Sequence, residues 1–385
     1  MEELLSLFDP LLGFFTADGW KMIVMWIIGG VLIYLAIKKK MEPTLLLPIG
    51  FGAILMNFPG VVTVVDGVTH FGGIAEPLHT LYNAGIANEL FPLLLFVGIG
   101  AMIDFGPLLN NPKLMIFGAA AQFGIFFTLC MASIFFPEIK DAASISIIGA
   151  ADGPTSIVVA NALGSNYVGA ITVAAYSYMA LVPIIQPPVI KLLTTKNERR
   201  IRMGYEQKSV KKSTKILFPI IISIIACIFA PAAGSLIGFL MFGNLIRECG
   251  VLDSISDTAQ NVLANLITIF LGITIAFNMH ASQFLALETL IIMGLGLIAF
   301  IVDTAGGVLF AKLYNVVMKI LGKPLINPMI GAAGISAFPM SGRIVHKMGL
   351  EEDNQNFLLM HSIGVNVSGQ IASVIAGALV LGFFS

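Results

Sequence analysis

The sequence predicts an all-α polytopic membrane protein, built from two inverted-topology repeats that each contain a re-entrant, broken-helix hairpin. The first observation is composition: of 385 residues, 57% are hydrophobic and only 11% are charged, whereas an ordinary soluble domain carries about 25% charged residues. The second is a series of apolar runs that approach the roughly 20 residues needed to cross a bilayer as a helix. The third is a pair of similar glycine-rich, polar stretches. This composition excludes a water-soluble fold.

The placement of basic residues predicts the orientation. Lysine and arginine concentrate on the cytoplasmic side of membrane proteins. The two basic loops, Lys38 to Lys40 and 191–215, are therefore expected inside the cell, and the stretch from Asn57 to Glu89, which lacks both residue types, outside. The N-terminal residues lack the basic region of a secretory signal, so the run from Met22 to Ile37 is expected to stay as a membrane span. We expect a multi-pass protein of the inner (cytoplasmic) membrane. The net charge of −1 gives no reason to expect a nucleic-acid partner.

With this orientation the chain divides into five segments. They are N-terminal membrane helices with an external loop (1–84), a first repeat with its hairpin at 142–163 (85–193), a basic cytoplasmic loop (194–215), connecting helices broken at Pro231 to Gly234 (216–257), and a second repeat with its hairpin at 327–341 (258–385).

Two pairs of similar sequences support the repeats. FVGIGAMIDF (96–105) aligns with FLGITIAFNM (270–279), and IIGAADG (147–153) aligns loosely with MIGAAGI (329–335), in the same order. Inverted repeats are frequent in transporters, whose site then lies near the middle of the membrane. The alternative is that two glycine-rich membrane segments look alike by composition alone.

The first hairpin contains a carboxylate in an interrupted helix. Asp152 is followed by Gly153 and Pro154, and proline removes a backbone donor and disfavours helix at the preceding residue. Non-helical backbone survives at membrane depth only inside protein or beside a watery cavity. Asp152, with the hydroxyls of Thr155 and Ser156, is therefore a candidate cation ligand. The alternative is that Asp152 only caps the following helix.

The second hairpin offers neutral oxygens from Asn327 and Ser336. One carboxylate with several neutral oxygens favours Na⁺ over Ca²⁺, which usually gathers several carboxylates. Arg343 follows this hairpin, either to neutralise a carboxylate or an anionic partner or only as a basic anchor. In the following spans Tyr178 and Asn366 are the candidates for function, although interhelical hydrogen bonds explain most such polar groups.

Other polar residues have no assigned function. We interpret Asp104 as interfacial, and Asp303 stays unassigned. His70 and His280 have no second ligand at a useful spacing, so no transition-metal site is expected.

Four motifs together resemble a known family. They are GAADGPTSIVVA (149–160), AAYSYMALVPIIQPP (174–188), NPMIGAAGISAFPMSGR (327–343) and GVNVSGQI (364–371). They are similar to the β subunit of the sodium-pumping, biotin-dependent decarboxylases, whose members act on oxaloacetate, methylmalonyl-CoA or glutaconyl-CoA. The resemblance runs from about residue 20 to the end of the sequence.

The resemblance implies a carboxybiotin decarboxylase subunit and translocase. It would release CO₂ from carboxybiotin held by a partner subunit, export Na⁺ and consume an external proton. The implied partners are a biotin carrier, a carboxyltransferase, a small membrane-anchored subunit and membrane lipid, with the chain as a homotrimer. The sequence carries no biotinylation motif with a lysine between methionines, so the choice of substrate is expected to lie in another chain.

The resemblance also implies roles for individual residues. In the family, the residues that match Asp152, Tyr178, Asn327 and Ser336 serve Na⁺ and proton coupling, and the one that matches Arg343 is implicated as well. We therefore expect Asp152, Tyr178, Asn327 and Ser336 to bind Na⁺. For catalysis we expect Asp152, Arg343 and Asn366, with Arg343 also contacting carboxybiotin. The alternative function is a stand-alone Na⁺-coupled secondary transporter of an organic anion, which would share the inverted hairpins.

Overall fold

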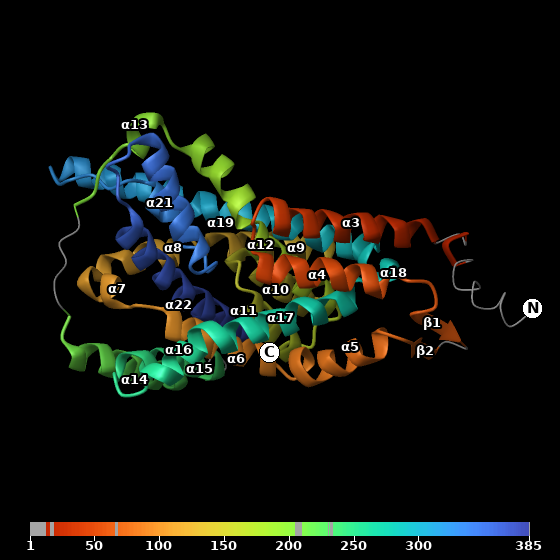
Figure 1. Cartoon of the computed structure of the whole chain (residues 1–385). Coiled ribbons are helices and arrows are strands. Elements are labelled where there is room, and N and C mark those ends of the chain that lie inside the picture. Colours follow the sequence, from red (N-terminus) through yellow and green to blue (C-terminus); the bar gives the residue numbers. More distant parts are fainter. Residues whose placement is uncertain are drawn as a thin grey trace, which may run out of the picture. The chain divides into compact units, whose positions relative to one another are not determined.

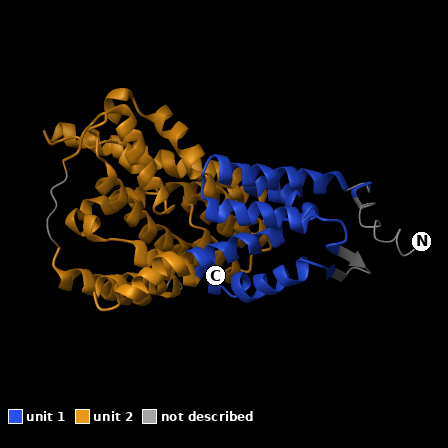
Figure 2. Ribbon diagram, in the orientation of Figure 1, with its two compact units in different colours: residues 1–92, 265–293 blue, residues 93–264, 294–385 orange. Residues whose placement is uncertain are grey.

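The computed structural model of the chain describes residues 13–15, 19–65, 68–204, 210–229, 231 and 234–384. Described residues are helical almost throughout (Figure 1). They form two compact units, residues 1–92 with 265–293 and residues 93–264 with 294–385 (Figure 2). The N-terminal residues 1–12 expected outside the cell, residues 205–209 of the basic loop, and residues 232 and 233 of the expected break lie outside the described residues.

The first unit begins with the short 3₁₀ turn η1 (Gly13–Phe15). Two helices that pack side by side follow it, α3 (Gly19–Lys38) and α4 (Pro43–Met56) (Figure 1). Glycines allow this close packing, because a Cβ atom built on Gly29 would lie 2.6 Å from the carbonyl oxygen of Gly50. The remaining elements of the unit are β1 (Val62–Val65), β2 (Val68–Phe71), α5 (Ala75–Leu81), the π-helix η2 (Tyr82–Ala87), α17 (Ala264–Ile275), the 3₁₀ turn η7 (Ala276–Met279) and α18 (Ala281–Phe284).

The stretch expected as an external loop contains the antiparallel pair β1 and β2, in which Val62 lies opposite Phe71. The all-helical prediction did not include these strands. Both are rich in valine and threonine, whose branched side chains favour extended backbone.

The second unit holds most of the helices. In chain order they are α6 (Leu90–Met102), α7 (Gly106–Asn110), η3 (Pro112–Leu114), α8 (Met115–Ala120), α9 (Phe123–Phe135), α10 (Ile139–Ser146), η4 (Ile147–Ala150), α11 (Gly153–Ala162), α12 (Val168–Leu193), α13 (Lys196–Arg199), α14 (Lys212–Phe229), α15 (Gly234–Glu248), α16 (Asp253–Asp257), η6 (Thr258–Leu263), α19 (Leu287–Ile320), α20 (Met329–Ala332), α21 (Met340–Glu352) and α22 (Leu359–Phe384).

Six helical stretches among the described residues are long and apolar enough to cross a membrane. They are Gly19–Lys38, Pro112–Phe135, Val168–Leu193, Asp253–Met279, Leu287–Ile320 and Leu359–Phe384. Two further helical stretches, Ala75–Ala87 and Leu90–Met102, are bent by 60° relative to each other and together pass the same test. The prediction of an all-α, multi-pass membrane protein is confirmed.

Both stretches predicted as hairpins are interrupted helices. In the first, α10 leads through the turn η4 to Ala151, whose φ of 54° is left-handed, and α11 begins at Gly153. In the second, α20 has only four residues, and the next helix, α21, begins at Met340. The non-helical residues between them are 333–339.

Glycines bring the second interrupted stretch into backbone contact with its neighbours. A Cβ atom on Gly331 would collide with the carbonyl of Gly307 in α19, and one on Gly369 of α22 would collide with the carbonyl of Gly334. Larger residues would separate these backbones, so the glycines fix the position of residues 331–334 between α19 and α22.

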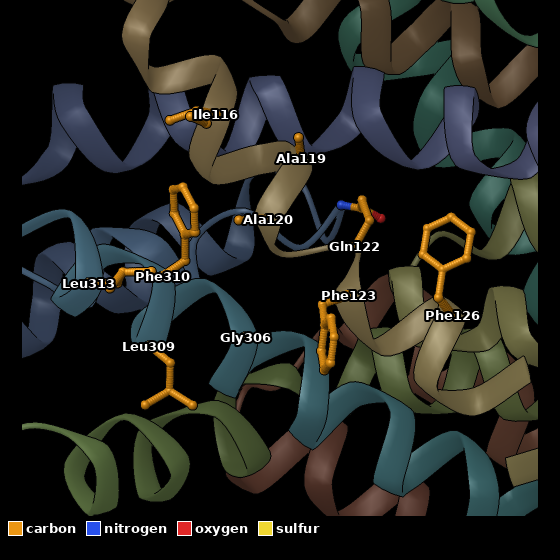
Figure 3. A pocket seen from close by; sticks show the side chains of 10 residues that line it. All are labelled: Ile116, Ala119, Ala120, Gln122, Phe123, Phe126, Gly306, Leu309, Phe310 and Leu313. Carbon is orange, nitrogen blue, oxygen red and sulfur yellow. The ribbon is translucent and has the colours of Figure 1, made fainter. Parts of the chain in front are cut away.

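An apolar groove of about 630 Å³ lies between α8, α9 and α19 (Figure 3). Phe123, Phe126 and Leu309 line it with largely exposed side chains, which is how a surface facing lipid is built. One polar group, the amide of Gln122, also lines it.

Candidate functional site

The carboxylate of Asp152 lies in the first interrupted stretch as the N-cap of α11. The side chain is buried, and its Oδ1 accepts the backbone N–H of Thr155 at 3.3 Å. Pro154 occupies the first turn of the helix. Backbone N–H groups in this turn have no acceptor within the helix, so the missing N–H of proline costs no hydrogen bond. The capping alternative raised by the sequence is therefore present in the structure, and it involves one oxygen of the carboxylate.

The other oxygen, Oδ2, is saturated by three side-chain donors. Thr155 Oγ1 lies at 2.8 Å, Gln370 Nε2 at 3.1 Å and Ser373 Oγ at 2.8 Å. Gln370 and Ser373 come from α22, so the carboxylate links α11 to a distant helix. These donors favour the ionised form of the carboxylate, whereas burial of the side chain favours the neutral acid. Oδ1, with one long hydrogen bond, keeps the capacity to bind a cation.

Two tyrosines of α12 have separate environments. The side chain of Tyr176 is fully buried, and its Cζ, the carbon that carries the hydroxyl, lies against Gly153, where a Cβ atom would collide with it. The hydroxyl of Tyr176 has no hydrogen-bond partner among the described residues. Tyr178, the predicted Na⁺ ligand, instead packs against Gly296 of α19. Tyr176 is therefore the tyrosine placed next to the Asp152 break.

The two interrupted stretches meet through a backbone hydrogen bond. The N–H of Ser336 donates to the carbonyl of Ala150 at 3.0 Å, two residues before Asp152. The Ser336 hydroxyl donates to the carbonyl of Gly369 at 2.9 Å, and Asn366 Nδ2 donates to the carbonyl of Ile335 at 2.7 Å. The structure thus brings Asp152, Ser336 and Asn366 into one cluster around α22.

Asn366 keeps a free acceptor in this cluster. Its Oδ1 is buried and has no hydrogen-bond partner among the described residues. Asn366 and Gln370 are four residues apart on α22, hence on one face of the helix, and Gln370 contacts Asp152. The polar positions 366, 370 and 373 follow helical spacing. Sequence reasoning did not identify Ser373, and this spacing is the signal that could have found it.

Asn327 belongs to a different environment. Its Nδ2 donates to the carbonyls of Arg199 at 2.8 Å and Ile201 at 3.0 Å, and its Oδ1 accepts the N–H of Met329. These bonds attach the start of the second interrupted stretch to the last residue of α13 and to the segment that follows it. Among the described residues, hydrogen bonds to the Asp152 carboxylate come from Thr155, Gln370 and Ser373, and Asn327 is not among them.

Arg343 lies in the first turn of α21 with an exposed side chain. At the other end of α21, ion pairs attach the helix to the segment around α13. Arg199 Nε contacts Glu352 Oε1 at 2.6 Å, and Arg202 Nε contacts Asp353 Oδ2 at 2.7 Å. The hydrogen bond from Arg202 is the main cause that lowers the pKa of Asp353 below its usual value. The charged segment thus holds one end of α21, while Arg343 near the other end has an exposed side chain.

Comparison with known proteins gives consistent matches. The family described as the Na⁺-transporting oxaloacetate decarboxylase beta subunit matches residues 21–384. The methylmalonyl-CoA decarboxylase subunit beta of Propionigenium modestum is 46% identical over 379 residues, with 94% of each chain covered. The glutaconyl-CoA decarboxylase subunit beta of Acidaminococcus fermentans is 48% identical over 367 residues, with 95% of this chain and 94% of the relative covered. The oxaloacetate decarboxylase beta chain of Haemophilus ducreyi is 42% identical over 439 residues.

Proposed function

Because the chain belongs to the family of Na⁺-transporting decarboxylase beta subunits, we propose that Asp152 is the group through which it couples decarboxylation to Na⁺ export. The chain is the membrane subunit of a Na⁺-transporting decarboxylase, and this membership decides against the stand-alone secondary transporter. In the proposal, CO₂ is released from carboxybiotin carried on a partner subunit. The observation that carries the proposal is the buried Asp152 carboxylate beside the contact between the two interrupted stretches.

Na⁺ is proposed to bind at Oδ1 of Asp152 with neutral oxygens nearby. Support comes from the saturated Oδ2 and the unpartnered Oδ1 of Asn366. The unpartnered hydroxyl of Tyr176 is a further candidate ligand. Ser336 positions the second break through its N–H, and Asn327 and Tyr178 act outside this cluster. Oxygen ligands of this kind suit a hard monovalent cation.

Asp152 is proposed to carry Na⁺ and a proton alternately. Burial in a low-dielectric site favours the neutral acid when the cation is absent, and a bound cation favours the carboxylate. Na⁺ and a proton therefore cannot be bound to the Asp152 carboxylate at the same time. Decarboxylation of carboxybiotin consumes a proton, and the exchange at Asp152 supplies that proton while Na⁺ moves the other way.

Arg343 is proposed to contact carboxybiotin from the cytoplasmic side. Its exposed guanidinium is held on a helix that ion pairs anchor at its other end, and guanidinium groups bind carboxylates through paired hydrogen bonds. The further partners, a biotin carrier with a carboxyltransferase and a small membrane-anchored subunit, are proposed from the motif resemblance, as are the homotrimer and the cytoplasmic membrane.

The test is Asp152→Asn in the assembled complex. Asparagine keeps the size and an acceptor for capping but cannot carry the charge. We expect the variant to assemble, to retain carboxyl transfer to biotin, and to lose both Na⁺ uptake into inverted membrane vesicles and Na⁺-stimulated CO₂ release. Asp104→Asn, which changes an ion-paired carboxylate away from this cluster, is the control and should retain both. Pumping by Asp152→Asn at near the wild-type rate would reduce Asp152 to a helix cap.

A further inference from the structure

Asp303 is a second buried carboxylate that the proposed function leaves unused. It lies near the middle of α19, one of the candidate spans, and its side chain is fully buried. Here α19 passes beside the start of α9, with Gly306 next to Phe123 (Figure 3). Carboxylates inside a span are rare and usually functional. Each of the two oxygens of Asp303 meets a different element, and these contacts indicate what the carboxylate does.

Oδ1 of this carboxylate caps a broken helix. The candidate span Pro112–Phe135 is interrupted at Ala121 and Gln122, between α8 and α9, and α9 has no side-chain cap of its own. Oδ1 accepts the backbone N–H groups of Gly124 and Ile125 in the first turn of α9. The first N–H groups of a helix lack regular partners within it, and a carboxylate is a favourable acceptor there. The cap of α9 is therefore supplied by α19.

Oδ2 packs against the first interrupted stretch. A Cβ atom built on Gly149, in η4, would lie 2.7 Å from this oxygen and 3.1 Å from the Cβ atom of Ala299. Oδ2 is buried and has no hydrogen-bond partner among the described residues. The carboxylate thus takes up the space that a side chain at position 149 would need.

Glycines enclose the carboxylate from two sides. A Cβ atom on Gly124 would collide with Oδ1 of Asp303 and would lie 2.7 Å from the carbonyl oxygen of Ala299. Gly124, Gly149 and Ala299 therefore form a socket around the side chain of Asp303. Close-packed interiors transmit small changes of side-chain size to their neighbours. The fit of one carboxylate in this socket thus sets how α9, α19 and η4 lie against one another.

The same face of α19 contacts both interrupted stretches. A Cβ atom on Gly296 would lie 2.9 Å from the side chain of Ile148, in the first stretch. Asp303 follows seven residues later on the same face and contacts the next residue of that stretch. Gly307, one turn further, contacts the backbone of the second stretch. Asp303 therefore lies where support for the first stretch meets support for the second.

The turn η4 leads directly to the Asp152 break. Gly149 lies three residues before Asp152, and Ala150 accepts the N–H of Ser336 from the second stretch. A shift of η4 therefore moves the start of the Asp152 cap and the junction of the two stretches together. Groups that bind an ion must be held to within about 0.5 Å of their working positions. The socket is close enough to the break to control that geometry.

We propose that Asp303 is a positioning residue for Na⁺ transport, which holds η4 against α9 and thereby fixes the geometry of the Asp152 break. This inference rests on the proposed Na⁺ site. Asp303 acts through its shape and its acceptor oxygen, and it carries no ion itself. Its role is therefore different from that of Asp152, which needs its charge.

Two substitutions separate shape from charge. Asp303→Asn keeps the size of the side chain and an acceptor for the amides of α9 but loses the charge, whereas Asp303→Glu keeps the charge and is too long for the socket. The assembled complex is assayed for carboxyl transfer to biotin and for the Na⁺ dependence of decarboxylation. We expect Asp303→Asn to need nearly the wild-type Na⁺ concentration for half-maximal rate. Asp303→Glu should need about tenfold more, an effect typical of overpacking, with carboxyl transfer unchanged.

Gly149→Ala provides a second measurement, because a longer acid at position 303 can fail to fold. The added methyl group presses on Asp303 from the opposite side and should also raise the Na⁺ requirement several-fold. Asp303→Ser shortens the side chain, so Gly149→Ala should have little further effect in that background. Gly294→Ala on the same helix meets no atom within 4 Å and should change the Na⁺ requirement in neither background.

The thermal unfolding midpoint, recorded for every variant, separates positioning from general stability. The proposal is overturned if Asp303→Glu and Gly149→Ala lower this midpoint and leave the Na⁺ dependence unchanged. Loss of transport in Asp303→Asn also overturns it, because the charge would then be required. Equal effects of Gly149→Ala with Asp303 and with Ser at position 303 would contradict the contact. In all three cases Asp152→Asn still fails to pump, whereas near wild-type pumping by Asp152→Asn overturns the proposed Na⁺ site and this inference with it.

Discussion

Asp152 depends on side chains that are far from it in sequence. Thr155 is a neighbour in the same stretch, but Gln370 and Ser373 follow it by 218 and 221 residues. The sequence predicted that Asp152 is functional because a carboxylate in an interrupted span has few other reasons to exist. It could not predict the donors, because the pairing of α11 with α22 is a property of the tertiary packing.

The two tyrosines illustrate the same limit. Positions 176 and 178 are about 200° apart around an α-helix, so at most one of them can face Asp152. Sequence reasoning selected Tyr178, and the structure places Tyr176 against Gly153 and Tyr178 against Gly296. Helical spacing could have shown that these faces differ, but not which face meets the first interrupted stretch.

Ser373→Ala tests the donor set of Asp152. Removing a hydrogen bond to a charged group costs about 1.5–3 kcal/mol, which corresponds to roughly tenfold or more in an equilibrium constant. We therefore expect the Na⁺ concentration for half-maximal decarboxylation to rise about tenfold. The control is Ser362→Ala on the same helix, because the Ser362 hydroxyl donates to backbone carbonyls such as that of Gly342. Equal Na⁺ dependence in both variants would exclude Ser373 from the site.

At the scale of elements, the interruptions were predicted more accurately than the contacts they make. Proline and glycine next to Asp152 predict an interruption of the helix, and the structure has one between η4 and α11. The contact of Gly331 with Gly307 could not be inferred, because a glycine in a membrane helix is equally compatible with a turn, a flexible point or close packing. The strands β1 and β2 were not predicted either. The stretch that contains them lacks lysine and arginine, which indicated on which side of the membrane it lies but not its secondary structure.

A matched pair of glycines in α19 tests this close packing. Gly307→Ala places a methyl group against the carbonyl of Gly331, whereas Gly294→Ala meets no atom within 4 Å. Overpacking of this kind costs about 1–3 kcal/mol, so Gly307→Ala should lower the thermal unfolding midpoint of the purified complex and reduce Na⁺ transport. Gly294→Ala should leave both unchanged. Similar midpoints for the two variants would mean that α20 moves aside without cost.

At the scale of the whole molecule, we propose that the two interrupted stretches are re-entrant hairpins that enter from opposite sides. The distribution of lysine and arginine supports this arrangement, as do the paired motifs of the two repeats. The structure places ion pairs of the basic segment 194–204 at the end of α21, so one set of charges is gathered near the second stretch.

Single cysteines test this orientation in a variant without Cys130, Cys227 and Cys249. Glu138→Cys precedes the first stretch and Lys323→Cys precedes the second, and both positions are exposed. We expect an impermeant thiol reagent to modify the first from outside the cell and the second only in inverted vesicles. Glu138 is preferable to the nearby Asp141, which is buried and accepts hydrogen bonds from Ser165 and Asn166. The opposite pattern of modification would contradict the inverted repeats.

The distant donors of Asp152 also bear on how the protein is made. Because Gln370 and Ser373 are translated 218 and 221 residues after Asp152, the first interrupted stretch is inserted into the membrane before its carboxylate has these partners. The set of hydrogen-bond donors around this carboxylate is completed only when α22 is in place. A chain still attached to the ribosome therefore lacks two of the hydrogen-bond donors of its proposed Na⁺ site.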